Sequence, residues 1–532
     1  MSVKLPVYEV AHKSPEPEGL TMLATELFGA KHAELEELDG RVVARQNGIA
    51  VELHTASGGI FAADQSRLRD PHARPSLPSA EKAYALAGEL LERHNLLPDL
   101  GSDDFELTNI GAGGSLVAVR SNGRRSHHAL DVQARYAVTL RNPGVEGEPE
   151  RLPMIGGGGK VSVTFGGGAK PIGLMNGWRT VTGKRMVEAI DVREATERFT
   201  EFTKHLELTD VRSYLAYHAA PAHTSQELLT PVYVFGATIV ADDGERVPMR
   251  LVSIPATEFG PEIPHYKPQP ARKPQKRESR STSVPRGPAA NPSEAGTSWI
   301  GMLGGLGGSQ QNAQGFVDSL AADGWTVNFN WGDANAWESD WDANDDNYLD
   351  TADFVFYTGH ANQNGWMLAN PGTQNLVQLT PSVVGSVPQT PGDRWGQQDL
   401  EWVIVAACGP LQDDIISAGG GDVLSRWEGA FDGLHTLMGY GAVTNDNTEE
   451  GRRVVQYSRE GTPVIDAWFR TAQEIQPSTN GYSAPNGPDV WVGAMYVAKP
   501  GADPRQDRIW GHGTVAPDPS SPTDLVCMWT TC

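Results

Sequence analysis

The sequence predicts an α/β fold, in which a C-terminal, mainly parallel sheet flanked by helices follows N-terminal α+β modules. Apolar runs alternate with helical patterns after residue 298, as in a parallel sheet buried on both faces. A proline-rich segment without apolar periodicity precedes this region. We therefore expect four parts: an α+β module at 1–150, a second module at 151–259, a proline-rich and basic linker at 260–297, and a C-terminal domain at 298–532.

The composition is that of a folded globular protein. Of 532 residues, 39% are hydrophobic and 20% are charged. No run of eighteen apolar residues occurs, so no segment is expected to cross a membrane. The N-terminus lacks the apolar core of a secretory signal, and the sequence as written predicts a cytoplasmic chain.

The acidic charge gathers in the C-terminal part. The whole chain has a net charge of −23, and from Ile300 onward 29 acidic residues face 9 basic ones. Such a region would repel a nucleic-acid backbone, so nucleic acid is not an expected partner. The charge fits a basic polypeptide partner, or it serves solubility alone.

Two rounds of helix followed by strands make up residues 1–259. The first contains a helix at 79–97, opened by Ser79 as a cap, and strands at 131–141 and 160–181. The second contains a helix at 191–206 and strands within 228–254. These modules resemble the small PepSY-type modules that accompany bacterial peptidases as propeptides.

The glycine run at 156–159, followed by Lys160, is not a phosphate loop. Such a loop needs Ser or Thr after the lysine and then a helix, whereas Val161 opens a strand pattern. The run predicts a hairpin turn.

The linker is expected to be extended, exposed and open to proteases. It carries seven basic residues: Lys267, Arg272, Lys273, Lys276, Arg277, Arg280 and Arg286.

After the linker, six apolar strands are expected, with a glycine loop at 304–310 after the first. Three helices are expected near 310–325, 423–431 and 461–475. The strands are expected at 298–303, 326–331, 352–360, 401–408, 434–443 and 489–497. Ligands of such sheets bind beyond the carboxyl ends of the strands.

Two chemically active residues stand directly after buried strands in this region. His360 ends the run "DFVFYTGH" and Cys408 ends "EWVIVAAC". If the strands are parallel neighbours, both side chains emerge at one edge, where an imidazole can take the proton of a thiol nucleophile. His435 and His512 are alternative partners for Cys408; Gly513 follows His512, but His512 comes after the cysteine in the chain and no apolar run precedes it.

The segments "DFVFYTGHA" and "EWVIVAACGP" resemble the paired signature of the caspase, gingipain, legumain and clostripain superfamily (clan CD) of cysteine peptidases. Ala407-Cys408 matches that signature, whereas Ala361 stands where the superfamily has glycine. The resemblance implies a His360–Cys408 dyad and a thioester intermediate. It also implies an oxyanion site of backbone N–H groups from Cys408 and from Gly359 or Ala361.

The resemblance also implies an endopeptidase made as a precursor. Residues 1–259 would be a prosegment that acts as an intramolecular inhibitor or chaperone, and the linker would be the maturation site. The basic linker and acidic C-terminal part fit cleavage after Arg or Lys. The alternative is a catalytically inactive binding or scaffold protein on the same fold, with Ala361 marking a decayed site, and a thiol transpeptidase is a third reading.

No cofactor is required for this chemistry, but one acidic loop resembles a calcium loop. Its oxygen donors are Asp342, Asn344, Asp346, Asp350 and Asp353, with the carbonyl of Tyr348. Asn347 replaces the usual glycine of such loops, and a strand rather than a helix follows. A solvated acidic loop is the alternative.

The remaining cysteines, Cys527 and Cys532, are too few for a disulfide framework. They either close a small loop or stay free in a flexible tail.

Overall fold

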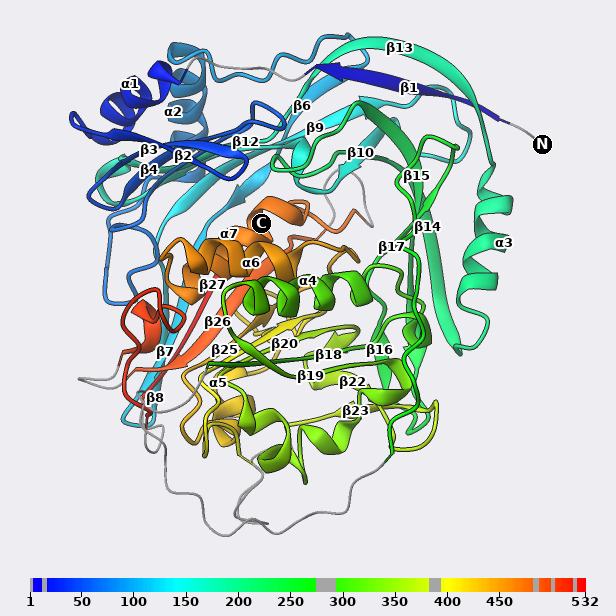
Figure 1. Cartoon of the computed structure of the whole chain (residues 1–532). Helices are drawn as coiled ribbons and strands as arrows, with labels where there is room; N and C mark the ends of the chain where they lie inside the picture. Colours follow the sequence, from blue (N-terminus) through cyan, green and yellow to red (C-terminus); the bar gives the residue numbers. More distant parts are fainter. Residues whose placement is uncertain are drawn as a thin grey trace.

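The computed structural model describes residues 3–11, 17–273, 293–381, 394–481, 488–498, 503–519 and 524–532. The chain has the mixed α/β character that the sequence predicts. Figure 1 shows two large sheets with helices between them. Lys276, Arg277, Arg280 and Arg286 of the linker lie outside the described residues.

The first sheet has fifteen strands in the order β13-β1-β15-β14-β10-β9-β11-β12-β5-β4-β3-β2, with β16 and β17 on β15 and β6 on β9. Its strands are β1 (Val3–Ala11), β2 (Glu34–Leu38), β3 (Arg41–Gln46), β4 (Ile49–His54), β5 (Ile60–Asp64), β6 (Phe105–Gly113), β9 (Val132–Arg141), β10 (Arg151–Ile155), β11 (Lys160–Phe165), β12 (Pro171–Asn176), β13 (Thr180–Ala189), β14 (Leu208–His218), β15 (Leu228–Val240), β16 (Arg246–Pro248) and β17 (Val252–Pro255).

The predicted boundary at residue 150 is wrong. β9 precedes this boundary in the sequence, whereas its two neighbours in the sheet, β10 and β11, follow it. One continuous sheet therefore contains residues from both sides of the boundary. The predicted hairpin between β10 and β11 is also wrong, since β9 lies between the two strands.

The second sheet has nine strands in the order β19-β18-β20-β24-β25-β26-β27-β7-β8. Its first five strands are mutually parallel and the rest pair antiparallel, so the sheet is only partly parallel. The strands are β18 (Glu294–Trp299), β19 (Thr326–Gly332), β20 (Phe354–Thr358), β24 (Trp402–Ala406), β25 (Thr436–Tyr440), β26 (Trp491–Val497), β27 (Leu525–Thr531), β7 (Ser115–Ser121) and β8 (Arg124–Ala129).

Strands β7 and β8 come from the N-terminal part of the chain and extend the second sheet: β7 pairs with β27, and β8 pairs with β7. The prediction that all of residues 1–259 form separate modules is therefore wrong for 115–129. The segment that contains these residues is joined to the C-terminal part of the chain by main-chain hydrogen bonds.

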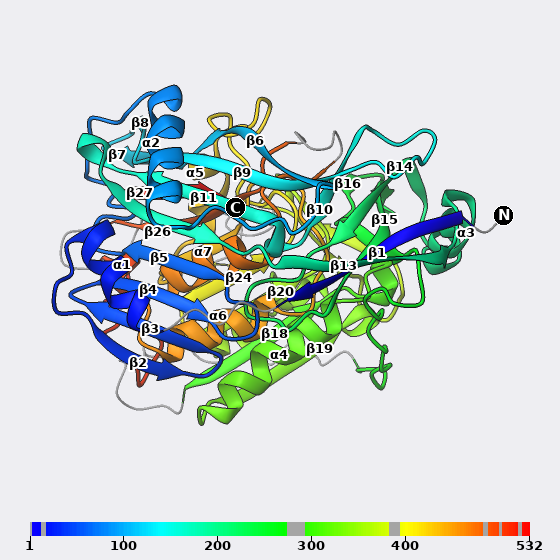
Figure 2. The ribbon, with the colours of Figure 1, turned by 90° about the horizontal axis from the view of Figure 1, so that it is seen from above.

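Helices α4 (Ser309–Ala322), α6 (Glu450–Arg459) and α7 (Val464–Ile475) lie between the two sheets (Figures 1 and 2). On the first sheet lie α1 (Glu18–Phe28), α2 (Ala80–Arg93), where Ser79 is the predicted N-cap, and α3 (Val192–Phe202). The other face of the second sheet carries α5 (Val423–Trp427) and a small sheet of β21 (Ala361–Asn362), β22 (Gly365–Ala369) and β23 (Leu376–Leu379).

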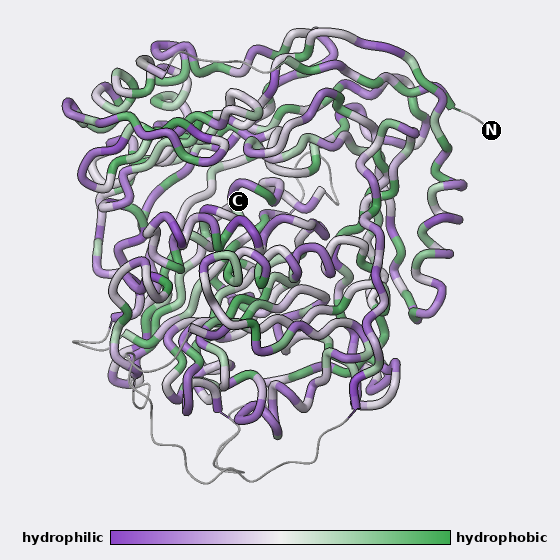
Figure 3. Tube along the Cα trace, viewed as in Figure 1, coloured by the Kyte–Doolittle hydropathy of each residue, from purple (hydrophilic) through white to green (hydrophobic). Residues whose placement is uncertain are grey.

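The central strands of the second sheet are apolar on both faces, which explains their continuous hydrophobic runs (Figure 3). Phe354 and Phe356 pack toward α4, α6 and α7, whereas Val355 and Tyr357 pack into the opposite core. That opposite core includes a cluster of four buried tryptophans in which each ring contacts at least two of the others: Trp341, Trp366, Trp395 and Trp427.

The linker begins as predicted without regular structure, but its described part is docked rather than free. The side chain of Gln269 hydrogen-bonds the backbone of β19, and β18 begins at Glu294, before the predicted linker ends. None of the helices in the described ranges is long and apolar enough to cross a bilayer.

Candidate functional site

Strands β20 and β24 deliver His360 and Cys408 to the same edge of the second sheet. The strands are parallel neighbours, and their last residues, Thr358 and Ala406, are paired in register. His360 and Cys408 each follow two residues later, and both are fully buried. The structure thus brings the predicted pair to one edge of the sheet.

The imidazole of His360 is held at both nitrogens. Nε2 donates to the carbonyl of Gly304 at 2.7 Å, and Nδ1 accepts from the backbone N–H of Arg250 at 3.1 Å. A Cβ on Gly304 would lie 3.0 Å from the ring, so the glycine allows this approach. Burial, foremost, and the guanidinium of Arg250 lower the pKa of His360 to about 4, although the hydrogen bond to Gly304 opposes this shift. The ring is therefore neutral near pH 7.

Cys408 is a buried thiol rather than a thiolate. The N–H of Thr444 points to Sγ at 3.4 Å, and the Thr444 hydroxyl lies 3.8 Å away. Burial raises the pKa of the Cys408 thiol, although Arg250 and Thr444 oppose that rise. Gly409 follows with φ of +80°, and this conformation turns the chain sharply away from the strand.

Arg250, from the short connection between β16 and β17, also lies at this edge, and the sequence did not predict it there. Its side chain is fully buried at the ends of both strands. One terminal nitrogen donates to the hydroxyl of Thr358 at 3.0 Å and to the carbonyl of Ala406 at 2.7 Å. The N-terminal part of the chain therefore fills the edge where His360 and Cys408 emerge.

The charge of Arg250 is matched by Glu450 at the start of α6. The second terminal nitrogen lies 3.3 Å from both Glu450 oxygens and donates to the carbonyl of Asn445 at 2.7 Å. The carboxylate also accepts from Tyr440 at 2.7 Å and Gln476 at 2.8 Å. Its oxygens are therefore fixed independently of Arg250.

The backbone around Arg250 pairs with the segment that follows β25. The N–H of Leu251 donates to the carbonyl of Thr444, and the N–H of Asp446 donates to the carbonyl of Leu251, both at 2.9 Å. A cavity of about 280 Å³ lies beside this pairing, and Asn445, Asp446 and residues 261–264 are part of its lining. At this edge of the second sheet, the pocket filled by the Arg250 side chain therefore lies beside an open cavity.

The predicted oxyanion residues lie in a tightly packed turn. A side chain on Gly359 would lie 2.2 Å from the Tyr357 hydroxyl, so the position requires glycine. Ala361 is fully buried at the start of β21, opposite Trp366. The carbonyl of His360 accepts from Met367 N–H at 2.9 Å. The hairpin β21–β22 therefore sets the conformation at Ala361.

The alternative histidines do not lie at this edge. His435 immediately precedes β25, at its amino end, and its Nδ1 lies 2.6 Å from Asp507. His512 pairs with Asp323, next to the C-terminus of α4, at 2.7 Å. Neither alternative partner of Cys408 lies at this edge, because His435 is bound to Asp507 and His512 to Asp323.

The predicted calcium loop, Asp342–Asp353, does not form. Asp350 accepts from the backbone N–H groups of Gly396 and Gln398, the carbonyl of Tyr348 accepts from the hydroxyl of Thr351, and Asp353 accepts from the N–H of Glu294. The donor spacing fitted a calcium loop, but short 3-10 turns send these groups to different neighbours.

Within the described ranges, one group of three carboxylates has ligand atoms within 4.8 Å of one another: Glu294, Asp353 and Asp399. Asp353 alone belongs to the predicted set. Burial, foremost, and the nearby Asp399 and Glu294 raise the pKa of Asp353 to about 8. The group therefore shares only Asp353 with the predicted calcium set.

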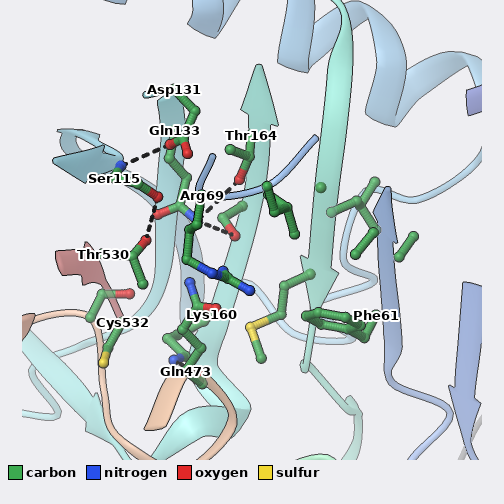
Figure 4. Close-up of a pocket in the computed structure, with 18 residues that line it drawn as sticks. Phe61, Arg69, Ser115, Asp131, Gln133, Lys160, Thr164, Gln473, Thr530 and Cys532 are labelled. Atoms are coloured by element: carbon green, nitrogen blue, oxygen red, sulfur yellow. Dashed lines mark hydrogen bonds between the residues drawn. The ribbon is translucent and has the colours of Figure 1, made fainter. Parts of the chain in front are cut away.

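Lys160 lines a small cavity of about 40 Å³ between the two sheets (Figure 4). Its ammonium donates to the carbonyls of Gln473 and Gln476 at the C-terminus of α7, at 2.7 Å for the latter. Burial lowers its pKa to about 8. Lys160 thus caps a helix, in agreement with the rejection of a phosphate loop.

All three cysteines are free and buried. The predicted flexible tail is wrong, because Cys527 lies in β27 and Cys532 directly follows it. Burial raises the pKa of the Cys532 thiol to about 12 and that of Cys527 well above its usual range.

We expect the native chain to react with iodoacetamide at least about tenfold more slowly than the denatured chain at neutral pH, because each unit of raised pKa cuts the thiolate fraction tenfold. The rate should rise with pH as thiolate forms. Mass spectrometry of the alkylated chain over time measures this, and one rapidly labelled cysteine in the native chain would contradict the buried state of all three.

Residues 295–531 match a family described as "Domain of unknown function (DUF6345)". The chain is also similar to a solved structure, that of an uncharacterized protein from Eubacterium rectale ATCC 33656. The sequence identity is 10%, the match covers 50% of this chain and 86% of that chain, and the TM-score is 0.26. No curated protein matches the sequence. None of these likenesses carries an activity to this chain.

Proposed function

We propose that this chain is a latent cysteine endopeptidase of the caspase-like superfamily, held inactive by its own N-terminal part. The observation that carries the proposal is Arg250. Its guanidinium reaches the ends of the two strands that bear His360 and Cys408, where it pairs with Glu450. The arginine side chain of a bound substrate would occupy the same position.

Arg250 also explains why the resting site would be silent. Because Nε2 of His360 donates to Gly304, Nδ1 is the nitrogen free to accept a proton, and the N–H of Arg250 occupies it. The paired backbone of Leu251 takes the place that a substrate backbone would need. The segment 249–251 is thus the inhibitory element that the prosegment prediction requires.

Once this segment leaves, the chemistry follows from the dyad. The proton of Cys408 passes to Nδ1 of His360, and Sγ attacks the carbonyl carbon of the peptide bond. Backbone N–H groups of Cys408 and of Gly359 or Ala361 stabilise the oxyanion. His360 then protonates the departing amine, which leaves a thioester. Water, deprotonated by His360, hydrolyses the thioester and frees Cys408.

Glu450 is the carboxylate that would select Arg or Lys in the substrate. It is fully buried, and its remaining partners hold it in place for a cation. The cavity beside Asn445 offers space for neighbouring substrate residues. The basic linker remains the proposed maturation site, and Lys273 is its last described basic residue.

The alternative is a non-catalytic binding or scaffold protein. The observation that favours it is the same arginine: five hydrogen bonds from the Arg250 side chain, made to two strand ends, Asn445 and Glu450, make it part of a closed core. In that reading Cys408 and His360 are buried structural residues, and Ala361 marks a site that no longer acts.

Replacing the inhibitor and the nucleophile separates the two. Arg250→Ala vacates the pocket, so this variant should hydrolyse Nα-acetyl-arginine esters. Adding Cys408→Ala should reduce the rate by about a thousandfold or more. Cys527→Ala, a change of another buried cysteine, is the matched control and should retain activity. The proposal is overturned if Arg250→Ala hydrolyses the ester and cleaves the linker equally well with and without Cys408. It is also overturned if Arg250→Ala folds but does not hydrolyse the ester.

A further inference from the structure

Arg272, at the end of the described linker, lies in a cage of aromatic rings. Its Cζ is 3.4 Å from the ring centroid of Trp331, 4.0 Å from that of Trp337 and 4.7 Å from that of Tyr348. A guanidinium over aromatic faces is attracted by their negative charge, most strongly where water is excluded. The Arg272 side chain is only 12% exposed, so the cage excludes most of the water that would otherwise surround the guanidinium.

A single carboxylate closes the cage in the plane of the guanidinium. The terminal nitrogens of Arg272 lie 2.5 and 2.8 Å from the two oxygens of Asp340, and one also donates to the carbonyl of Asn335 at 3.1 Å. Asp340 is 3% exposed. Two parallel bonds select the planar fork of arginine over the point charge of lysine.

The chain that carries Arg272 lies against the edge strand of the second sheet. Gln269 donates to the carbonyl of Asn330 at 3.1 Å and accepts from the N–H of Gly332 at 2.8 Å, both in β19. The backbone N–H of Arg272 itself donates to Asn335 at 2.9 Å. Pro268 and Pro270 favour an extended backbone here. The arm Lys267–Arg272 is thus bound along its length.

We propose that Trp331, Trp337, Tyr348 and Asp340 form a binding site for the arginine side chain of an extended polypeptide, and that its ligand in this chain is the linker arm Lys267–Arg272. The other linker basic residues except Lys267 follow Arg272 in sequence. A cut after any of those leaves the arm seated on the second sheet, so the N-terminal part stays attached after cleavage. The site is independent of any activity at Cys408.

The test uses the full chain with Arg272→Ala and propylguanidine as the probe. The vacated cage should bind propylguanidine saturably, seen as a change in tryptophan fluorescence and a rise in Tm, whereas the native chain should show neither. Propylamine should bind at least about tenfold more weakly, because it cannot make the paired bonds to Asp340. A peptide of residues 265–275 should displace the probe, and the same peptide with citrulline for arginine should not.

The double variant Arg272→Ala with Asp340→Asn is the matched control and should lose the response. If Arg272→Ala does not fold alone, its refolding yield should depend on propylguanidine. The proposal is overturned by a probe response that is absent, that is equal in the native chain, or that survives the loss of the Asp340 charge.

Discussion

Arg250→Ala should lower the free energy of unfolding by about 3–5 kcal/mol, because it leaves the buried carboxylate of Glu450 without its counter-charge. The change also removes the donor to the hydroxyl of Thr358 and to the carbonyl of Ala406, whereas the carbonyl of Asn445 keeps Gln476 as a donor at 3.0 Å. Urea unfolding followed by circular dichroism measures the difference at the midpoint and in the slope.

The double variant Arg250→Met with Glu450→Gln separates the cost of an unpaired charge from the loss of contacts. Both charges are gone, and glutamine can still accept from Tyr440, so most of the stability should return. Arg246→Ala, which removes a well-exposed arginine paired with exposed Asp210, should change little. A loss for Arg250→Ala below about 1 kcal/mol would show that Glu450 does not depend on this cation.

The positions of His360 and Cys408 could be predicted because the information is local. Each residue directly follows an apolar run, and parallel neighbours in a sheet align such strand ends. Arg250 could not be found in this way. It lies 110 residues from His360 and 200 from Glu450, and nothing around it in sequence distinguishes it from a surface arginine.

The wrong predictions share the same physical cause. The calcium loop has donors at the right spacing, but Asp350 and Asp353 turn to backbone N–H groups from other segments. Strands β7 and β8 look in sequence like part of the N-terminal module, yet β7 pairs with β27 of the C-terminal part and carries β8 with it. Which strand pairs with which is decided by tertiary packing, which a single sequence does not contain.

The two parts of the chain are also joined by a buried network of charges. Glu52, in β4, lies 2.5 Å from Arg41 in β3 and 2.6 Å from Arg470 in α7. Arg470 and Arg453 in turn hold Glu474, at 3.2 and 3.0 Å. Separation of the N-terminal part would expose these groups, so the network opposes this separation as well as unfolding.

Glu52→Gln should weaken this junction and remove an acid-sensitive part of the stability. Burial alone would raise the pKa of Glu52, but Arg470 and Arg41 lower it to about 2, against 4.5 in the unfolded chain. Its contribution is therefore complete above pH 4.5 and is lost as the pH falls toward 2. Ionisation accounts for about 3 kcal/mol of it.

We therefore expect the free energy of unfolding of the native chain to fall steeply as the pH drops from 4.5 toward 2. The free energy of unfolding of Glu52→Gln should be lower above pH 4.5 and should fall less over the same range. Glu36→Gln is the matched control, since Glu36 is 52% exposed and pairs with Arg45 at 3.6 Å. Urea midpoints measured at several pH values give both curves. Parallel curves for the native chain and Glu52→Gln would show that the acid sensitivity arises from other groups. The contact between Glu52 in β4 and Arg470 in α7 would then stabilise the chain through packing rather than through charge.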